Sequence, residues 1–345
     1  MNQTRSAAPR PPHRPWPLRL LRERSVKLAV LCWIAANALV LALAGKALPF
    51  DWPGDAEGTP ADRLVEFNLR LLEVLILMGV VYWLTRKRPR LDLAERSPER
   101  SLALRETLWL VAYGVAGLIV GNLLARAFGW HPFALHLAGT LYGTHLHVTA
   151  AEAVTWAGYN LVVYAAVPLL YFRRRYSSTA LNLRSADRLG DTKVIIVVLV
   201  IESVVQYTAM HPETFDLEGR QLLLGLPLTF VLYLAGAVLP AMVFIYCILV
   251  PRFLRLTGST ATTVILGGLA YTALHVWDAW TVFDSPGRAV LSLVFLLATY
   301  FAPGMIKTWL TVRTGNAWVH VWAYHAFAPH TLHDTPNIVR IFGIR

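Results

Sequence analysis

Residues 222–250 read LLLGLPLTFVLYLAGAVLPAMVFIYCILV, a run of 29 residues without an acidic or basic side chain. At about 1.5 Å of rise per residue, a helix of this length exceeds the hydrocarbon layer of a bilayer, which is about 30 Å thick. The run therefore predicts a membrane-spanning helix. Gly225, Pro227 and Pro240 interrupt it and predict kinks.

The rest of the chain repeats this pattern. Of 345 residues, 56% are hydrophobic and 15% are charged, whereas about 25% are charged in an average soluble domain. Further spans are expected at 26–48, 66–85, 107–125, 153–172, 194–210, 261–280 and 289–310, with a shorter ninth segment at 316–329. The sequence predicts an all-helical, polytopic membrane protein with eight or nine segments. Cys32 and Cys247 both lie in apolar runs, which argues against a disulfide framework, a cysteine metal site and thiol chemistry.

The basic residues are concentrated in alternate loops. The chain holds 32 Lys and Arg against 21 Asp and Glu, a net charge of +11. Residues 1–25, 86–106 and 173–193 are basic, whereas residues 49–65 and 211–221 are mainly acidic. Cytoplasmic loops carry the excess of Lys and Arg, so we expect a cytoplasmic N-terminus. The positive charge then sets orientation and indicates no nucleic-acid partner. Membrane lipid is the expected partner, and a bacterial inner membrane the expected location.

Few ionisable side chains fall at membrane depth, where each costs about 3 kcal/mol or more and marks a candidate functional residue. They are Glu73, Glu202, His275, Asp278, His320 and His325, with Glu152 at a span entrance. Lys307 lies near enough to the end of a span to snorkel towards water.

Three of these residues share one depth. Counted along helices from the inner edge, His275 lies at about 22 Å, and His325 and Glu73 each at about 18 Å, whereas Glu202 lies at about 12 Å. A glutamate and two histidines can activate a water, directly or through a divalent metal such as zinc. His275, His325 and Glu73 are thus the candidate catalytic residues, and the two histidines the candidate metal ligands. In the alternative, Glu73 pairs with Arg70 and the histidines only hydrogen bond neighbouring helices.

Two motifs surround these histidines. Residues 265–275 read ILGGLAYTALH, with Tyr271 four positions before His275, and residues 313–318 read RTGNAW ahead of His325. Over residues 175–330 the chain resembles the CPBP (Abi) family of intramembrane proteases, which includes the CAAX endopeptidases. The first motif is similar to that family's FxxxH signature and the second to its HxxxN or HxxxD signature. The resemblance implies a protease fold in which both histidines face one cavity.

The chain departs from the family at two places. The EExxxR signature would fall near residues 241–246, AMVFIY, which contain no glutamate or arginine, and Pro329 stands where Asn or Asp is expected, with His330 one place beyond. In the family, the missing glutamate activates water. Either another acid replaces it, with Glu73 the best match in depth, or the chain is a non-proteolytic relative.

These features divide the chain into a basic arm (1–25), a four-span region (26–172) and a CPBP-like core (173–345). The expected function is cleavage of membrane-associated peptides by a water held between a carboxylate and His275 and His325. One alternative is a catalytically inactive scaffold that binds hydrophobic segments. The sequence leaves the substrate, the metal and the oligomeric state open.

Another alternative is a metal- or haem-binding membrane subunit. Imidazole suits zinc, iron and copper, and the outer side is rich in histidines: His131, His136, His145, His147, His320, His325, His330 and His333. An interval of five residues does not place His320 and His325 on one face of an α-helix. A transporter is disfavoured, because the two halves of the chain show no matched pair of broken helices.

Overall fold

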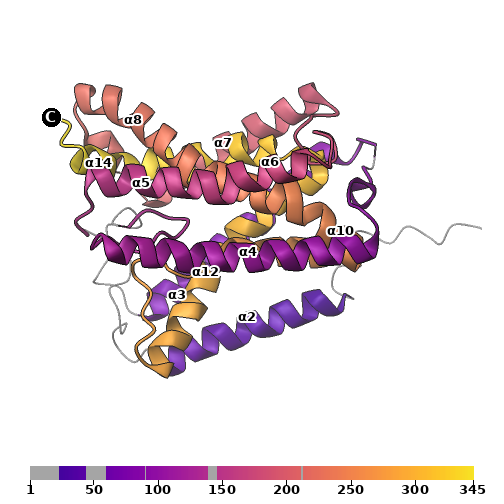
Figure 1. The fold of residues 1–345 in the computed structure, drawn as a ribbon, viewed down its shortest axis with the longest axis horizontal. Coiled ribbons are helices and arrows are strands. Elements are labelled where there is room, and N and C mark those ends of the chain that lie inside the picture. Colours follow the sequence, from indigo (N-terminus) through magenta and orange to yellow (C-terminus); the bar gives the residue numbers. More distant parts are fainter. Residues whose placement is uncertain (1–22, 44–59, 90, 139–145, 211–212) are drawn as a thin grey trace, which may run out of the picture.

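The computed structural model describes residues 23–43, 60–89, 91–138, 146–210 and 213–345. Within these ranges every regular element is helical (Figure 1). Most of the basic arm, most of the acidic segment 49–65 and His145 fall outside the described residues. The longer helices are α2 (Arg24–Leu43), α3 (Pro60–Thr85), α4 (Arg100–Ala127), α5 (Ala150–Asn160), α6 (Val167–Arg173), α7 (Arg188–Met210), α8 (Gly219–Tyr233), α10 (Val250–Thr257), α11 (Thr260–Ala273), α12 (Pro286–Thr314) and α14 (His333–Ile341).

Among the described residues, five helices are long and apolar enough to cross a membrane. They are α2, α4, the continuous helices Ala150–Arg173 and Gly219–Thr257, and α12. Large apolar side chains cover the outer surfaces, as on α2, where Leu28 and Leu31 are 62% and 63% exposed. Extended apolar surface of this kind is suited to contact with lipid. The all-helical class is therefore confirmed for the described residues, and the candidate spans are consistent with a multi-pass membrane protein, while the count of eight or nine segments and the orientation stay predictions.

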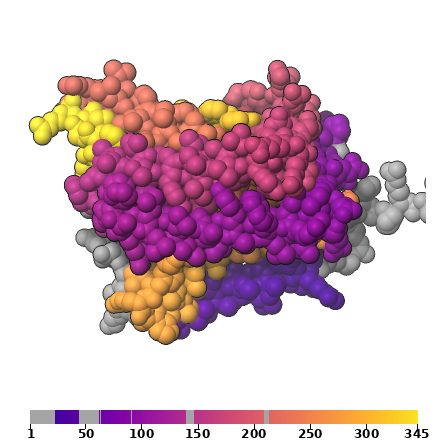
Figure 2. All heavy atoms as spheres, viewed as in Figure 1, coloured from indigo at the N-terminus to yellow at the C-terminus, as the bar shows by residue number. Residues whose placement is uncertain are grey.

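Helix α4 and the helix formed by α5 and α6 cover one face of the molecule (Figures 1 and 2). The hydroxyl of Tyr159 donates a hydrogen bond of 2.6 Å to the carbonyl of Gly117. A Cβ on Gly117 would lie 2.9 Å from Val163, and one on Gly121 would lie 2.9 Å from Tyr159. These two glycines therefore allow close packing within the chain.

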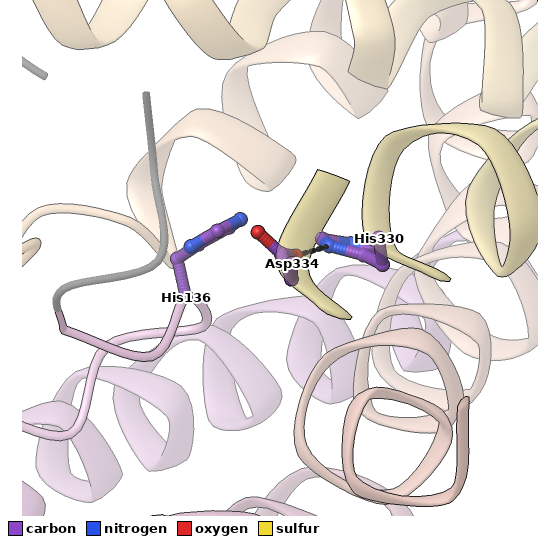
Figure 3. A group of neighbouring side chains, drawn as sticks. All are labelled: His136, His330 and Asp334. Atoms are coloured by element: carbon purple, nitrogen blue, oxygen red, sulfur yellow. Dashed lines mark hydrogen bonds and ion pairs between the residues drawn. The ribbon is translucent and has the colours of Figure 1, made fainter. Parts of the chain in front are cut away.

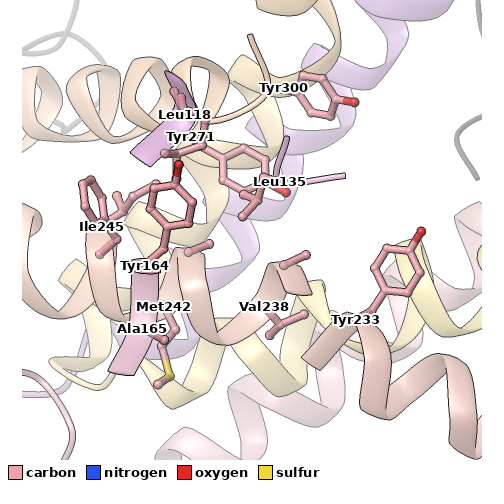
Figure 4. Packing of buried hydrophobic residues seen from close by; sticks show 14 of the residues in the cluster. Leu118, Leu135, Tyr164, Ala165, Tyr233, Val238, Met242, Ile245, Tyr271 and Tyr300 are labelled. Carbon is pink, nitrogen blue, oxygen red and sulfur yellow. The ribbon is translucent and has the colours of Figure 1, made fainter. Parts of the chain in front are cut away.

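The run 222–250 forms the centre of the core. Its second half, Met242–Leu249, is fully buried and π-helical, and a second π-helical turn covers Leu234–Val238. Figure 4 shows part of the surrounding apolar cluster, with Tyr233, Val238 and Met242 from this segment. Because Pro240 has no N–H, it cannot bond the carbonyl of Gly236 four residues earlier. The Nδ2 of Asn160 donates to that carbonyl instead, at 2.9 Å.

A buried ion pair connects α10 to α4. The Nε and Nη2 atoms of Arg252 lie 2.9 and 2.5 Å from Oε2 of Glu106, and the hydroxyl of Tyr176 donates to Oε1 of Glu106 at 2.8 Å. Arg252 is 1% exposed and Glu106 is 6% exposed. Both charges are thus compensated inside the protein, as a buried ion pair requires.

Helix α11 is shorter than predicted. It begins after Gly258, whose φ of 64° suits glycine, and it ends at Ala273, so the predicted span 261–280 is wrong at its C-terminal end. α11 packs closely on α12, since a Cβ on Gly304 would lie 2.8 Å from the Cα of Gly268 and 2.7 Å from the Cβ of Tyr271. The early end of α11 leaves His275 in the turn that follows.

The last segment is longer than predicted and is not a regular α-helix. Instead of ending at 329, it continues from Trp318 to Ile341. Two π-helical turns, Val321–His325 and Phe327–Leu332, form its middle. The N–H of Ala326 bonds the carbonyl of Val321 five residues earlier, at 2.9 Å, which is the hydrogen-bond pattern of a π-helix.

Candidate functional site

Five buried histidines form a row through the core, here called the histidine cluster. Its members, in spatial order, are His275, His136, His330, His325 and His320. Successive ring centroids are separated by 6.2, 5.2, 5.2 and 5.7 Å, and none of the five residues is more than 6% exposed. The cluster contains His275 and His325, the two histidines that the sequence analysis selected.

The π-helical turns align three members of the cluster. His320, His325 and His330 are five residues apart, and hydrogen bonding from residue i to residue i+5 brings such residues towards one face of a helix. The expectation that His320 and His325 lie on different faces assumed α-helical geometry and is therefore wrong. Turns of this kind are frequent at functional sites.

His275 forms a pair with a carboxylate. Its Nδ1 lies 3.3 Å from Oδ1 of Asp278, and the hydroxyl of Tyr300 donates to Oδ2 of the same carboxyl group. The rings of His275 and Tyr300 also stack, with centroids 3.6 Å apart. These contacts fix the orientation of the imidazole and leave Nε2 buried without a hydrogen-bond partner among the described residues. Burial raises the pKa of Asp278, in the loop after α11, to about 7.

His136 enters the cluster on the loop between α4 and α5. The N–H of Leu135 donates to the carbonyl of Leu274, at 3.1 Å. The carbonyl of Ala134 accepts hydrogen bonds from Nε1 of Trp156 and Nδ2 of Asn160, at 2.8 and 2.9 Å. Burial lowers the pKa of His136 to about 4, so its imidazole is neutral at pH 7.

Tyr271 connects the two histidines selected from the sequence. Its ring centroid lies 4.9 Å from that of His275 and 5.6 Å from that of His325, and its hydroxyl oxygen lies 3.1 Å from Nε2 of His325. The ammonium group of Lys307 lies 3.7 Å above the Tyr271 ring and is 1% exposed. The expectation that Lys307 snorkels towards water is therefore wrong, because it points into the core.

Four buried imidazole nitrogens of the cluster have no hydrogen-bond partner among the described residues. They are Nε2 of His275, Nε2 of His320, Nδ1 of His325 and Nε2 of His330. An unsatisfied buried polar group costs about 1–3 kcal/mol, so a group of four suggests that water, a ligand or a metal completes the site.

Glu73, the third residue selected from the sequence, belongs to a separate polar group. It lies on α3, with its carboxyl group close to that of Glu202 on α7. Nε2 of Gln206 donates to Oε1 of Glu202 at 2.8 Å. The acid that contacts His275 is Asp278, which the sequence analysis named as a membrane-depth residue without assigning it to the site.

The other histidines named from the sequence have different surroundings. Nδ1 of His131 lies 2.8 Å from Oε1 of Glu152, and His147 is exposed. Asp334, which the sequence analysis missed, contacts His330 with its Oδ2, 3.0 Å from Nδ1. His330 and Asp334 are four residues apart, a spacing that brings side chains to one face of an α-helix. This spacing was the signal in the sequence that could have identified Asp334.

A cleft of about 330 Å³ opens from the surface towards Asp278. It lies between the C-terminal end of α4 and the loop that joins α11 to α12. The lining residues include Asn122, Arg126, Trp277, Asp278 and Phe283. Five of its nine lining residues are polar or charged: Asn122, Arg126, Asp278, Thr281 and Asp284.

Comparisons with family models, curated proteins and solved structures found no match to this chain.

Proposed function

We propose that the chain is an intramembrane hydrolase that cleaves peptide bonds of membrane-associated substrates, as a divergent relative of the CPBP proteases. The observation that supports this most is the buried pair of His275 and Asp278, with Nε2 of His275 unpartnered and a cleft reaching Asp278. A histidine oriented by a carboxylate is a common general base. In this proposal Asp278 takes the role that the sequence analysis gave to Glu73.

The chemistry follows from the orientation of His275. Its Nε2 takes a proton from water as the water oxygen bonds to the carbonyl carbon of the substrate. The same nitrogen then returns the proton to the leaving amine as the C–N bond breaks. Asp278 and Tyr300 hold the imidazole in place throughout. The products are one carboxylic acid and one amine.

Tyr271 and His325 can stabilise the oxyanion that forms in this step. If Nε2 of His325 donates its proton to the oxygen of Tyr271, the tyrosine O–H is free to donate to the oxyanion. Nζ of Lys307, above the same ring, is a further hydrogen-bond donor close to it. Donors fixed at such a position typically contribute about 10²–10³-fold to the rate.

The proposed topology places the N-terminus in the cytoplasm of a bacterial cell, with the arm on the inner face of the plasma membrane. The five apolar helices support an integral membrane protein, and the distribution of basic loops supports the orientation. The cleft then opens on the outer half of the bilayer, where a peptide segment can enter.

The test compares membrane peptides from cells with and without the protein, and then measures cleavage of an identified peptide by the purified full chain in vesicles. We expect H275A and D278N each to lower kcat by about 10²–10⁴-fold, the usual contribution of a general base and its orienting group. H325A should also lower kcat, whereas H147A, at an exposed position, should not.

Cleavage that is unchanged in H275A and D278N would overturn the proposal. Retained peptide binding without any cleavage by the unaltered chain would instead favour a scaffold that binds hydrophobic segments.

A further inference from the structure

We infer that His136, His330 and Asp334 form a binding site for one divalent metal ion, and that this ion is zinc. One donor atom from each residue lies within 4.8 Å of the other two donor atoms. Figure 3 shows the Asp334 carboxyl group between the two imidazole rings. The metal site does not depend on the hydrolysis proposed above.

The three ligands come from separate parts of the chain. His136 lies on the loop between α4 and α5, His330 in the second π-helical turn of the last segment, and Asp334 on α14. They are 6%, 3% and 1% exposed. A site made from separate elements and closed to solvent can hold its ligands in a fixed geometry, which metal coordination requires.

The local charges favour a cation. A buried carboxylate is costly unless it is paired or coordinates a metal. The other two members of the group, His136 and His330, are imidazoles and carry no fixed positive charge. The imidazole of His136 would offer one nitrogen lone pair to a metal. Nε2 of His330 is buried without a hydrogen-bond partner in the part of the chain that the structure describes. A divalent cation would compensate the carboxylate and accept these lone pairs.

The ligand set fits zinc. Zinc binds His nitrogen and Asp oxygen at about 2.0–2.2 Å, and catalytic sites use three protein ligands and leave one position open. Tetrahedral ligands at that distance lie about 3.3 Å apart. The donor atoms of the three residues all lie within 4.8 Å of one another, so they would have to approach by up to about 1.5 Å to reach that spacing.

Tyr233 supports the ligands from the next shell of contacts. Its ring stacks on that of His330, with centroids 4.4 Å apart and planes 18° apart, and its hydroxyl hydrogen bonds the Asp334 carboxyl group. Contacts that orient ligands in this way commonly affect metal affinity by about 10–100-fold.

The experiment measures zinc binding by the purified full chain. The protein, carrying an affinity tag without histidines, is stripped with a chelator in detergent, equilibrated with buffered ZnCl₂ and analysed for metal content. We expect one zinc ion per chain. D334N and H330Q should each raise the Kd for zinc by at least tenfold, whereas H320Q, in the same cluster but outside the triad, and the exposed H147Q should retain the original Kd.

Two further measurements cover variants that fail to fold. Co²⁺ added to the stripped, unaltered chain should give the visible absorption bands of a low-coordinate nitrogen and oxygen site, and zinc should raise its unfolding temperature. An unaltered chain that binds no zinc at micromolar free concentration would overturn the inference. So would equal zinc affinity in D334N and the unaltered chain. Neither result depends on a substrate, so failure here is distinct from failure of the hydrolase proposal.

Discussion

The amide of Asn160 offers a sharp test of how the core positions His136. Nδ2 of Asn160 donates to two carbonyls, those of Ala134 and Gly236, each at 2.9 Å. Leucine has a similar size but no donor, so N160L removes both hydrogen bonds while it largely preserves packing. We expect the loop that carries His136 to become less well held.

The cost can be worked out for each carbonyl. The carbonyl of Ala134 keeps its hydrogen bond from Trp156, so its loss is about 1 kcal/mol, the net value of one hydrogen bond. The carbonyl of Gly236 has no helical donor at Pro240 and is left buried, which costs about 1–3 kcal/mol. Oδ1 of Asn160 is buried without a partner among the described residues, and its removal offsets about 1 kcal/mol of this cost. N160L should therefore lower the free energy of unfolding by about 1–3 kcal/mol.

A second substitution isolates the contribution of the hydrogen bond to Gly236. P240A restores an N–H four residues after Gly236, so in the N160L background it should recover about 1–2 kcal/mol. In the unaltered background, where Asn160 already satisfies the carbonyl, P240A should have a smaller effect. Unfolding of the four proteins of this cycle in mixed detergent micelles, followed by tryptophan fluorescence, gives the coupling energy. If the effects of the two substitutions on the free energy of unfolding are additive, Asn160 does not substitute for a helical donor at the carbonyl of Gly236.

Three other predictions use the same unfolding assay. Because Oε1 of Glu202 accepts a hydrogen bond from Nε2 of Gln206, E202Q, which keeps an acceptor there, should be nearly neutral, whereas E202A should cost about 1–3 kcal/mol; equal losses would show that this hydrogen bond does not contribute to stability. G304A should cost about 1–3 kcal/mol by forcing α12 away from α11, and an unchanged stability would show that this contact can relax. R252M should lower the free energy of unfolding by about 3–5 kcal/mol, because it leaves Glu106 buried without its ionic partner. The double variant R252M/E106L, which removes both charges, should be much less destabilised than R252M. An equal loss of stability in the two variants would indicate that packing alone matters.

Much of the fold follows from hydropathy, because long apolar runs have few alternatives in a bilayer. Residues 222–250 and 289–310 indicate helices that the structure contains, with boundaries extended by a few residues. The ends of α11 and of the last segment could not be placed in this way. Hydropathy continues past Ala273, but the turn there is stabilised by tertiary contacts, such as the bond from Leu135 to Leu274.

The candidate site was predictable in its chemistry and not in its geometry. His275 and His325 stood out because ionisable residues at membrane depth are rare. Glu73 was chosen by depth alone, which gives no information about the direction of a side chain around its helix. The structure turns Glu73 towards Glu202, whereas Asp278, three residues from His275, is held against it by a turn and by Tyr300.

The π-helical turns of the last segment have a consequence for chain length. A π turn contains one residue more than an α turn. Its hydrogen bonds therefore depend mainly on the number of residues between His320 and His330, and less on the identity of those residues. Removing one residue from Val321–His325 would restore α-helical bonding and rotate everything that follows by about 100°. His330 and Asp334 would then leave their present positions. The spacing of these histidines should therefore tolerate substitution far better than insertion or deletion.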